Sequence, residues 1–509
     1  MNFRPIARNA IAVALTAILL CLNSGCTVKK VRKLDVSAVA RPEMHHLVGI
    51  TTKKGEEVKF DLPGAKVEQG VIKAKVNSAD YSIAMQDVQR LWVEMQGVSA
   101  SRSIGLAAAI VVGAAAALAI VLLIAIALKQ SCPFVYSWDG TRYVFDAEPY
   151  GGAITRGLER DDYAELEHLR EQDGLYRLLL TNEVDETQYT NLMELLVVDH
   201  ASGSRAVTNE AGNIRAFTGI QPLAAARDRE GNDLLPWLEA TDRKIWEPDA
   251  VAGPGGNLRQ EVILTFAKPA GVTHVNLLAN AATGLWGSYM IKRMVELNGR
   301  DSYKYLASLD KDPAAVRYLH VLGEREGMYR LPVEVEEETG WVARGTLPPG
   351  GPLLAEDRAI PLDVSRAIGN QLRIRLRPAA GFWALNSFQI AHGKGEAPLV
   401  NSVAASSART SEGKDVLAVL AAADNRYYPM PMMTDRAEVT FPAPPRKVGL
   451  DRTVFLHSRG WYQLHLRDNS APDLSALNRL RSVPGAAVRF AADRFTEWQR
   501  GDGPLGRQR

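Results

Sequence analysis

The stretch RLPVEVEEETGWVARGTL, residues 330–347, alternates apolar and polar side chains on either side of Thr339-Gly340. This alternation is typical of β-strands with one buried face, and the Thr-Gly pair predicts a turn between two of them. Short apolar runs follow, each separated from the next by Gly, Pro or Asn: IPLDVS (360–365), QLRIRLR (371–377) and FWALNSFQIA (382–391). Several short strands at such spacing predict an antiparallel β-sandwich or jelly roll.

The run from IPLDVS through FWALNSFQIA resembles the closing strands of a galactose-binding-like jelly roll. The resemblance implies a jelly-roll-like β-sandwich subdomain, which we place at residues 257–398. It implies no ligand, because no ligand-contact motif of that family is recognisable in this stretch.

Outward from this region, Asp139-Gly140 between FVYSW and TRYVF predicts a β-hairpin. The acidic run DDYAELEHL (161–169) predicts a helix, so residues 130–251 are expected to form a β-rich subdomain with an acidic helix. VTHVNLLANAATGLWGSYMIKRMVELNG (272–299) reads as a strand leading to a helix, with a packed approach or a kink at Gly284 and Gly287. The Ser/Ala-rich run up to Asp415 predicts an exposed linker, and the rest of the chain is divided into C-terminal strands and helices (416–500) and a tail (501–509).

The N-terminus carries the apolar run Ile11–Leu22 after Arg4 and Arg8, which is typical of an export signal because it is too short to span a bilayer. Ser24-Gly25-Cys26 resembles the lipobox of bacterial lipoproteins, with Asn23 where that motif usually has Leu. The resemblance implies a signal peptide at 1–25 and lipid attachment at Cys26. The alternative is a plain signal peptide or an uncleaved anchor with an incidental cysteine.

A second apolar segment, residues 104–128, has no charge and no proline, so it predicts a transmembrane helix that spans with some tilt. A buried hairpin helix is the alternative, but such a helix normally shows a polar stripe. Ala109, Gly113 and Ala117 recur every four residues, which is the spacing that lets two membrane helices pack closely. Self-association through this helix and chance spacing in an Ala-rich run remain equally open.

Between the two membrane signals we expect a basic juxtamembrane linker (26–45) and a small β-barrel-like module (46–98). The linker begins TVKKVRK, whose cations suit anionic headgroups as well as they suit a solvated linker. The module shows short period-two runs such as GVIKAKV and YSIAM, and this pattern resembles a small SH3-like or Sm-like barrel. The fold class is therefore mainly β with some α: this barrel, one transmembrane helix and a C-terminal region rich in β-sandwich or jelly-roll structure.

Composition narrows the function classes. Sixty Lys+Arg against 58 Asp+Glu give a net charge of +2, which does not suggest a nucleic-acid-binding protein, and three cysteines do not make a disulfide scaffold. The order of lipobox, small barrel, apolar helix, CPFVYSWDG and FLHSRGWYQLHL resembles a group of uncharacterised bacterial envelope lipoproteins. The resemblance implies a lipid-anchored or single-pass protein of the envelope membrane and brings no activity with it. The side of the large C-terminal region stays open, because Arg90 and Arg102 before the span are matched by Lys129 and Arg142 after it; its β-rich style mildly favours extracytoplasmic exposure.

Ligand-binding candidates lie in the predicted sandwich. In QLRIRLR the alternation places Arg373, Arg375 and Arg377 on one strand face, and such a row suits carboxylate or phosphate groups of a partner. The alternative is an exposed strand with edge-protecting charges. Trp341 and Trp383, with Phe382, offer a stacking platform for sugars, although aromatic side chains in sandwiches are usually core.

The acidic cluster from Asp161 to His168 presents carboxylates at helical spacing, so a Ca²⁺ site or an acid–base pair competes with a solvated helix face. No HExxH, CxxC, G-x-S-x-G or GxxxxGK[ST] motif is present, so we predict no metal site, no cofactor and no catalytic residue.

The leading hypothesis is a membrane-anchored envelope lipoprotein that acts as a non-enzymatic binding or assembly module, with membrane lipids and an envelope glycan or another envelope protein as partners. The alternative is an envelope glycan hydrolase whose carboxylate pair the sequence does not locate.

Overall fold

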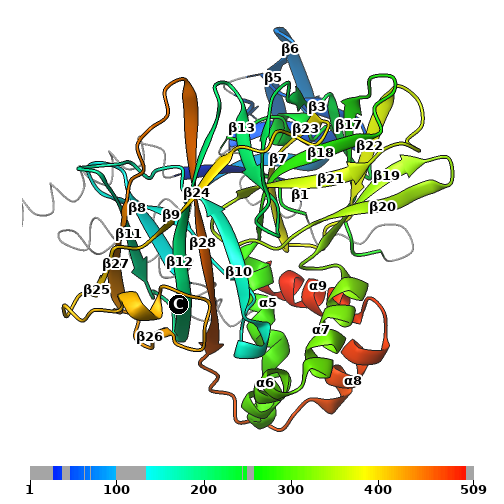
Figure 1. The fold of residues 1–509 in the computed structure, drawn as a ribbon. Helices are drawn as coiled ribbons and strands as arrows, with labels where there is room; N and C mark the ends of the chain where they lie inside the picture. The colour runs from blue at the N-terminus through cyan, green and yellow to red at the C-terminus, as the bar shows by residue number, and fades with distance from the viewer. Residues whose placement is uncertain are drawn as a thin grey trace, which may run out of the picture.

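The computed structural model describes residues 27–36, 46–61, 64–68, 70–98, 133–242, 245–248 and 257–499. The predicted mainly β fold with some α is confirmed: two β-sandwiches and a small strand-rich module account for most of the described chain, and helices cover one side (Figure 1). Within these residues no helix is long and apolar enough to cross a membrane. The predicted signal peptide, Cys26 and the predicted span at 104–128, with Ala109, Gly113 and Ala117, lie outside the described residues.

The N-terminal module pairs two small antiparallel sheets around one core, which is the strand-rich module that the alternation predicts. Its core includes Leu47, Ile50, Ile72, Leu91 and Val93, all almost fully buried. One sheet has the order β1 (Thr27–Asp35), β7 (Val88–Val98), β2 (His46–Thr52), β3 (Glu57–Lys59), and the other has β4 (Lys66–Glu68), β5 (Val71–Val76), β6 (Ala79–Ala84).

The predicted juxtamembrane linker at 26–45 is wrong over its first part, because β1 pairs with β7 from Thr27↔Val98 to Asp35↔Arg90. The side chain of Lys33 on this strand lies 2.6 Å from a carboxylate oxygen of Glu57 and 4.1 Å from the ring centroid of Trp92. The basic run TVKKVRK does not alternate strictly between apolar and polar residues, and its partner strand β7 is distant in the chain. No local pattern therefore identifies this run as a strand.

The first sandwich brings together two segments that are far apart in the chain. Residues 134–201 supply β8 (Phe134–Trp138), β9 (Tyr143–Ala147), β10 (Arg160–Glu165), β11 (Leu175–Thr181) and β12 (Glu186–Ala201). Residues 399–464 supply β24 (Leu399–Ala404), β25 (Ser407–Thr410), β26 (Tyr428–Met430), β27 (Arg436–Pro442) and β28 (Leu450–Leu464). One sheet has the order β10-β28-β12-β24, with β26 also on β12, and the other has β25-β27-β11-β8-β9.

Two predictions about this region are corrected. The acidic run after Asp161 is not a helix: it contains β10, which pairs antiparallel with β28 from Arg160↔Gly460 to Glu165↔Phe455. The run up to Asp415 is not a linker, because β24 pairs with β12 and β25 pairs with β27. Both segments are edge strands, and an edge strand needs only one partner and carries polar residues that resemble a loop or a helix face.

The second sandwich lies in the region for which a β-sandwich was predicted. The expected turn at Thr339-Gly340 joins two of its strands, and Gly340 adopts φ +103° there, a conformation that favours glycine. Its strands are β15 (Gln221–Pro222), β16 (Ala225–Asp228), β17 (Val262–Ala267), β18 (His274–Thr283), β19 (Leu331–Glu337), β20 (Gly340–Leu347), β21 (Glu356–Asp363), β22 (Gln371–Leu376) and β23 (Trp383–His392). They form sheets of order β15-β23-β18-β21 and β16-β17-β22-β19-β20.

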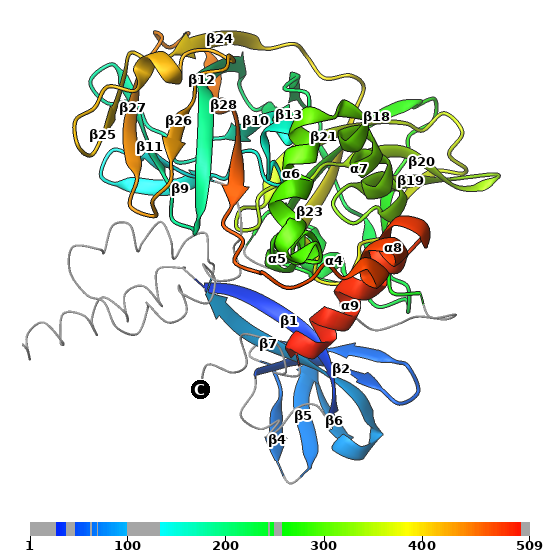
Figure 2. The ribbon, with the colours of Figure 1, turned by 90° about the horizontal axis from the view of Figure 1, so that it is seen from below.

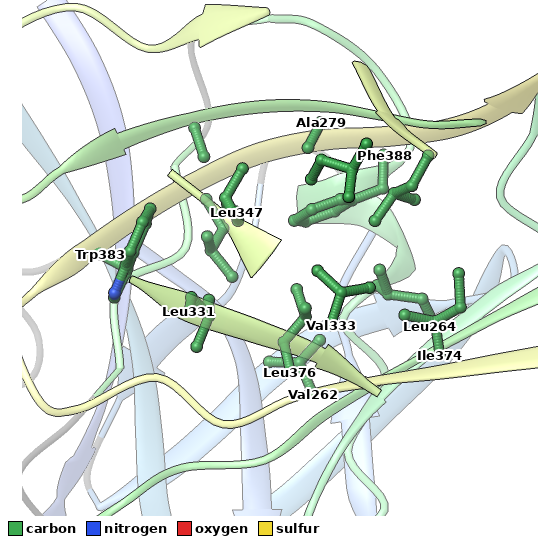
Figure 3. Close-up of a cluster of buried hydrophobic side chains, with 14 of the residues drawn as sticks. Val262, Leu264, Ala279, Leu331, Val333, Leu347, Ile374, Leu376, Trp383 and Phe388 are labelled. Carbon is green, nitrogen blue, oxygen red and sulfur yellow. The ribbon is translucent and has the colours of Figure 1, made fainter. Parts of the chain in front are cut away.

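Alternate residues of these two sheets meet in the largest core of the molecule (Figure 3). Leu264, Ile374 and Leu376 come from one sheet and Phe388 from the other, all at 0% exposure. A small hairpin of β13 (Arg205–Thr208) and β14 (Ile214–Phe217) lies between the sandwiches, and a short helix α4 (Leu235–Leu238) contacts β16 and β23.

Five longer helices stand beside the second sandwich, and α9 points toward the N-terminal module (Figure 2). They are α5 (Leu285–Glu296), α6 (Ser302–Lys311), α7 (Pro313–Glu326), α8 (Leu474–Ser482) and α9 (Ala486–Gln499). The predicted packed approach occurs at the N-cap of α5, where a Cβ on Gly284 would lie 2.4 Å from the carbonyl oxygen of Gly381. Short 3-10 helices occur at Met85–Asp87, Arg156–Leu158, Gly299–Asp301 and Leu417–Val419.

Candidate functional site

The predicted arginine row does not form a free cationic surface. Its strand β22 lies between β17 and β19, so the edge-protecting alternative is also wrong. Arg373 lies 2.6 Å from Glu336 and Arg375 lies 2.6 Å from Glu334, both across the strand pair. These cross-strand ion pairs stabilise the sheet and occupy the two guanidinium groups that were predicted to bind an anion.

The two predicted binding tryptophans are also engaged within the protein, whereas Arg377 is engaged through its backbone. Arg377 follows the end of β22, and its carbonyl oxygen accepts a hydrogen bond from Arg259. The ring of Trp341 has the guanidinium of Arg375 at 4.7 Å from its centroid. Trp383 is 1% exposed and its indole N–H donates to the carbonyl of Met328, so this side chain is core and offers no face to a sugar.

The acidic run contributes to a different feature, a hollow of about 280 Å³ at the free edge of β10. Strand β10 of the first sandwich contacts β21 of the second here, and the β13–β14 turn and the loop after β20 supply the other lining residues. We call it the β10 hollow; it is lined by Arg160, Asp161, Asp162, Tyr163, Asn209, Glu210, Ala211, Pro348, Pro349 and Arg358.

Successive residues of β10 point to opposite faces of the strand, so Asp161 and Asp162 have different partners. The carboxylate of Asp161 accepts from Arg459 at 2.7 Å and lies 3.0 Å from Nε2 of His457. The other ring nitrogen of His457 lies 2.6 Å from Glu194, and Tyr163 stacks on the ring at 4.4 Å. Asp161 is thus held by side chains of β28, the strand next to β10.

Asp162 is the centre of a second, more buried group of charges. Its carboxylate accepts backbone N–H bonds from Tyr150 at 2.7 Å and from Tyr163 at 2.8 Å. The guanidinium groups of Arg160 and Arg358 lie 3.2 and 3.6 Å away, respectively. These four contacts engage both oxygens of the Asp162 carboxylate.

Behind Arg358 lies Glu356, whose carboxylate is 2.6 Å from the guanidinium. Burial raises the pKa of Glu356 to about 7, and the charges of Asp162 and Glu148 add to the rise while Arg358 opposes it. Glu165, at the end of β10, is half-buried; burial, together with the nearby carboxylates of Asp357 and Glu167, raises its pKa to about 8. The contact between the sandwiches therefore holds two carboxyl groups whose environment favours the neutral form.

The β13–β14 turn forms the outer wall. Glu210 in this turn pairs with Arg330 at 2.8 Å, which joins the hairpin to the second sandwich. Asn209 accepts the backbone N–H groups of Ala211 and Asn213 on its side-chain oxygen. A Cβ on Gly212 would lie 2.3 Å from the ring of Tyr163, so this close contact requires glycine.

Sequence reasoning identified the acidic run but missed the residues that make it a site: His457, Arg459, Glu210 and Arg358. The alternation of His457 and Arg459 within FLHSRGWYQLHL was the available signal, because it marks a strand with a polar face. Nothing in the sequence indicates which strand that face meets. Across the part of the chain that the structure describes, no cluster of three or more His, Cys, Asp or Glu side chains is placed to hold a metal ion.

Comparisons with known proteins add no assignment. No protein-family model matches this chain, and no curated protein matches its sequence. The function must therefore be argued from the residues and the site.

Proposed function

We propose that this chain is a membrane-anchored bacterial envelope lipoprotein that acts as a non-enzymatic binding or assembly module, with an envelope glycan or another envelope protein as its partner. The export-signal pattern and Ser24-Gly25-Cys26 support the anchor. Two sandwiches joined by polar contacts, with a hollow at their junction, support a binding role.

The hydrogen bonds made by the carboxylates of the β10 hollow are the observation that favours binding over catalysis. Glycoside hydrolysis needs one protonated carboxylic acid and one carboxylate that is free to act as base or nucleophile. Asp161, Asp162 and Glu210 each accept hydrogen bonds from a guanidinium group, which occupies carboxylate oxygens, and the hydrogen bond from Arg330 lowers the pKa of Glu210. None of these three carboxylates is therefore free to act as the base or nucleophile.

One observation favours the hydrolase alternative. Glu356 and Glu165 have pKa values raised to about 7 and about 8, which suits a general acid near neutral pH. Neither lines the β10 hollow, and Glu356 is bonded to Arg358. We therefore keep envelope glycan hydrolysis as the second candidate.

The two functions are separated by incubating the full-length protein, in detergent, with peptidoglycan sacculi. We expect co-sedimentation without release of reducing ends. Release that is lost in Glu356→Gln would establish the hydrolase instead. If sacculi neither retain the protein nor are cleaved, a photo-crosslinker placed at Ala211 in intact cells tests for a protein partner. An adduct that forms at Ala211 but not when the crosslinker is moved to exposed Ser411 supports the proposal. No adduct at either position rejects it.

The lipid anchor has its own test. Cys26→Ser should abolish incorporation of labelled fatty acid and change the mass of the processed protein, because the thiol is the attachment point in the motif that the sequence resembles. Cys132→Ser is the matched control and should leave labelling intact. Unchanged labelling in Cys26→Ser contradicts the lipoprotein assignment.

A further inference from the structure

The hydrogen-bonding groups around the β10 hollow are used unequally. The three carboxylates on its lining accept bonds from within the protein, as described above. Donor groups on Arg160 and Asn209 do not find partners: among the described residues nothing accepts from Nε or Nη1 of Arg160, or from the side-chain amide nitrogen of Asn209. The groups left over are N–H donors, so the complementary ligand is an acceptor.

Arg160 is the least committed cation of the hollow. Its guanidinium makes one contact, from Nη2 to Asp162 at 3.2 Å, and its Nε is buried without an acceptor. Buried donors without partners are rare in folded proteins and call for an explanation by a missing water, ion or ligand. Arg358, in contrast, donates to Glu356 and to the carbonyl oxygen of Asp357.

The charges around Arg160 are otherwise paired. Asp161 is matched by Arg459 and Glu210 by Arg330. Asp162 already receives two backbone N–H groups and lies 3.6 Å from Arg358. Among the described residues Arg160 forms an ion pair with Asp162 alone, a partner that it shares with Arg358, although its charge also acts on the more distant Glu210 and Glu356.

The orientation of the Asn209 amide is determined by the turn. Its oxygen accepts the N–H groups of Ala211 at 3.0 Å and Asn213 at 2.9 Å, so the nitrogen is the atom left to donate. This donor and the guanidinium of Arg160 belong to different elements, the β13–β14 turn and β10, that line the same hollow.

We propose that the β10 hollow binds an oxyanion, the carboxylate or phosphate group of a small ligand, on the terminal Nη N–H groups of Arg160 that Asp162 does not use and on the amide nitrogen of Asn209. A guanidinium presents parallel donors that match two oxygens of such a group, and a neutral amide donor adds a third contact. A volume of about 280 Å³ admits the anion with part of the molecule that carries it. The inference rests on the proposed binding function, for which it names the ligand chemistry.

The test titrates the full-length protein, in detergent, with inorganic phosphate or with acetate, and uses chloride at the same ionic strength as the reference. The midpoint of thermal unfolding is measured at each anion concentration. Wild type should show saturable stabilisation by at least one of the two anions. Asn209→Asp keeps the oxygen that the turn needs and replaces the donor by a carboxylate oxygen. Arg160→Gln removes the guanidinium. Each variant should weaken anion binding by at least about tenfold.

Arg426→Gln is the matched control, because this guanidinium is exposed, pairs with Asp424 and does not line the hollow; it should bind like wild type. If Asn209→Asp fails to fold, Arg160→Lys replaces it, since it keeps the charge and loses the planar donors, and weaker binding is expected. Stabilisation by phosphate alone, or by acetate alone, supports the inference and identifies the anion.

No saturable effect in wild type overturns the inference, and so does an undiminished effect in the folded Arg160 and Asn209 variants. If the wild-type protein binds the anion but does not bind sacculi and gives no crosslinked adduct, the proposed function is rejected and the oxyanion site stands. One that binds an envelope component but no anion rejects this inference alone.

Discussion

Arg358 shows how one residue holds the two sandwiches together. Its side chain is 9% exposed and lies 2.6 Å from Glu356 on its own strand and 3.6 Å from Asp162 on β10. Replacing one partner of a buried ion pair leaves the other charges without compensation, and this is more destabilising than the net value of the pair.

We expect Arg358→Ala to lower the free energy of unfolding by about 3–5 kcal/mol, measured by denaturant titration. Arg426→Ala removes a guanidinium that is exposed and should leave the free energy of unfolding nearly unchanged. Similar losses in both variants would contradict the role assigned to Arg358.

Glu165 makes stability depend on pH. Burial raises its pKa from 4.5 to about 8, so between these values the folded protein keeps a proton that the unfolded chain has lost. The contribution of this residue to the free energy of unfolding is therefore full below about pH 4.5 and lost as the pH rises toward about 8. Between pH 5 and pH 8 the free energy of unfolding of wild type should therefore fall by ~1–3 kcal/mol more than that of Glu165→Gln.

Denaturant titrations at the two pH values check this, with Glu338→Gln in the exposed turn after β19 as the control. If wild type and Glu165→Gln lose the same stability between pH 5 and pH 8, the carboxyl group is not held in its neutral form by the fold.

At the scale of elements, local signals sufficed where they were strong. The hairpin at Asp139-Gly140, the turn at Thr339-Gly340 and the strand-to-helix passage into α5 are all present as predicted. β10, β24 and β25 were not recognised, because edge strands are specified by the strand they pair with more than by their own composition. Carboxylates spaced for a helix face fit the edge of a sheet equally well.

Helix α5 offers a test of close packing. Gly284→Ala places a Cβ 2.4 Å from the carbonyl oxygen of Gly381, so either α5 or the segment before β23 must move. We expect a loss of about 1–3 kcal/mol of unfolding free energy. Gly323→Ala on α7 meets no atom within 4 Å and should be neutral or stabilising by up to ~1 kcal/mol. Thermal unfolding of the two variants compares them directly, and equal midpoints would show that α5 is not tightly placed.

At the scale of the whole molecule, the chain leaves the first sandwich after β12, forms the second sandwich and returns at β24 (Figure 1). The domain boundaries predicted at 251, 257, 398 and 416 assume that each subdomain is built from one continuous segment of the chain. In the structure β12 pairs with β28 along almost its whole length, from Glu186↔Leu464 to Ala201↔Leu450.

A chain that ends after residue 398 lacks β24 to β28 and should fail to form the first sandwich, because β11 and β12 lose their central partners. Limited proteolysis should then yield no protected fragment that covers residues 134–201, whereas the full chain protects it. A protected fragment of that region in the shortened chain would show that 130–251 folds by itself.

The sequence alone determined the mainly β fold class, the sandwich strands around residues 330–391 and the two local turns, because alternation and turn residues act over a few neighbouring positions. It also carries two apolar runs from which we predict an export signal and a membrane span, because that prediction depends only on local apolar length. The tertiary structure alone decided that Arg373 and Arg375 of QLRIRLR are neutralised by Glu336 and Glu334, and that Trp383 is core. It alone brought Asp161 to Arg459, and Asp162 to Arg358, at the edge strand that lines the hollow. Partners nearly 200 or 300 residues away along the chain leave no local pattern, because their contact arises from strand pairing and from the packing of two sandwiches.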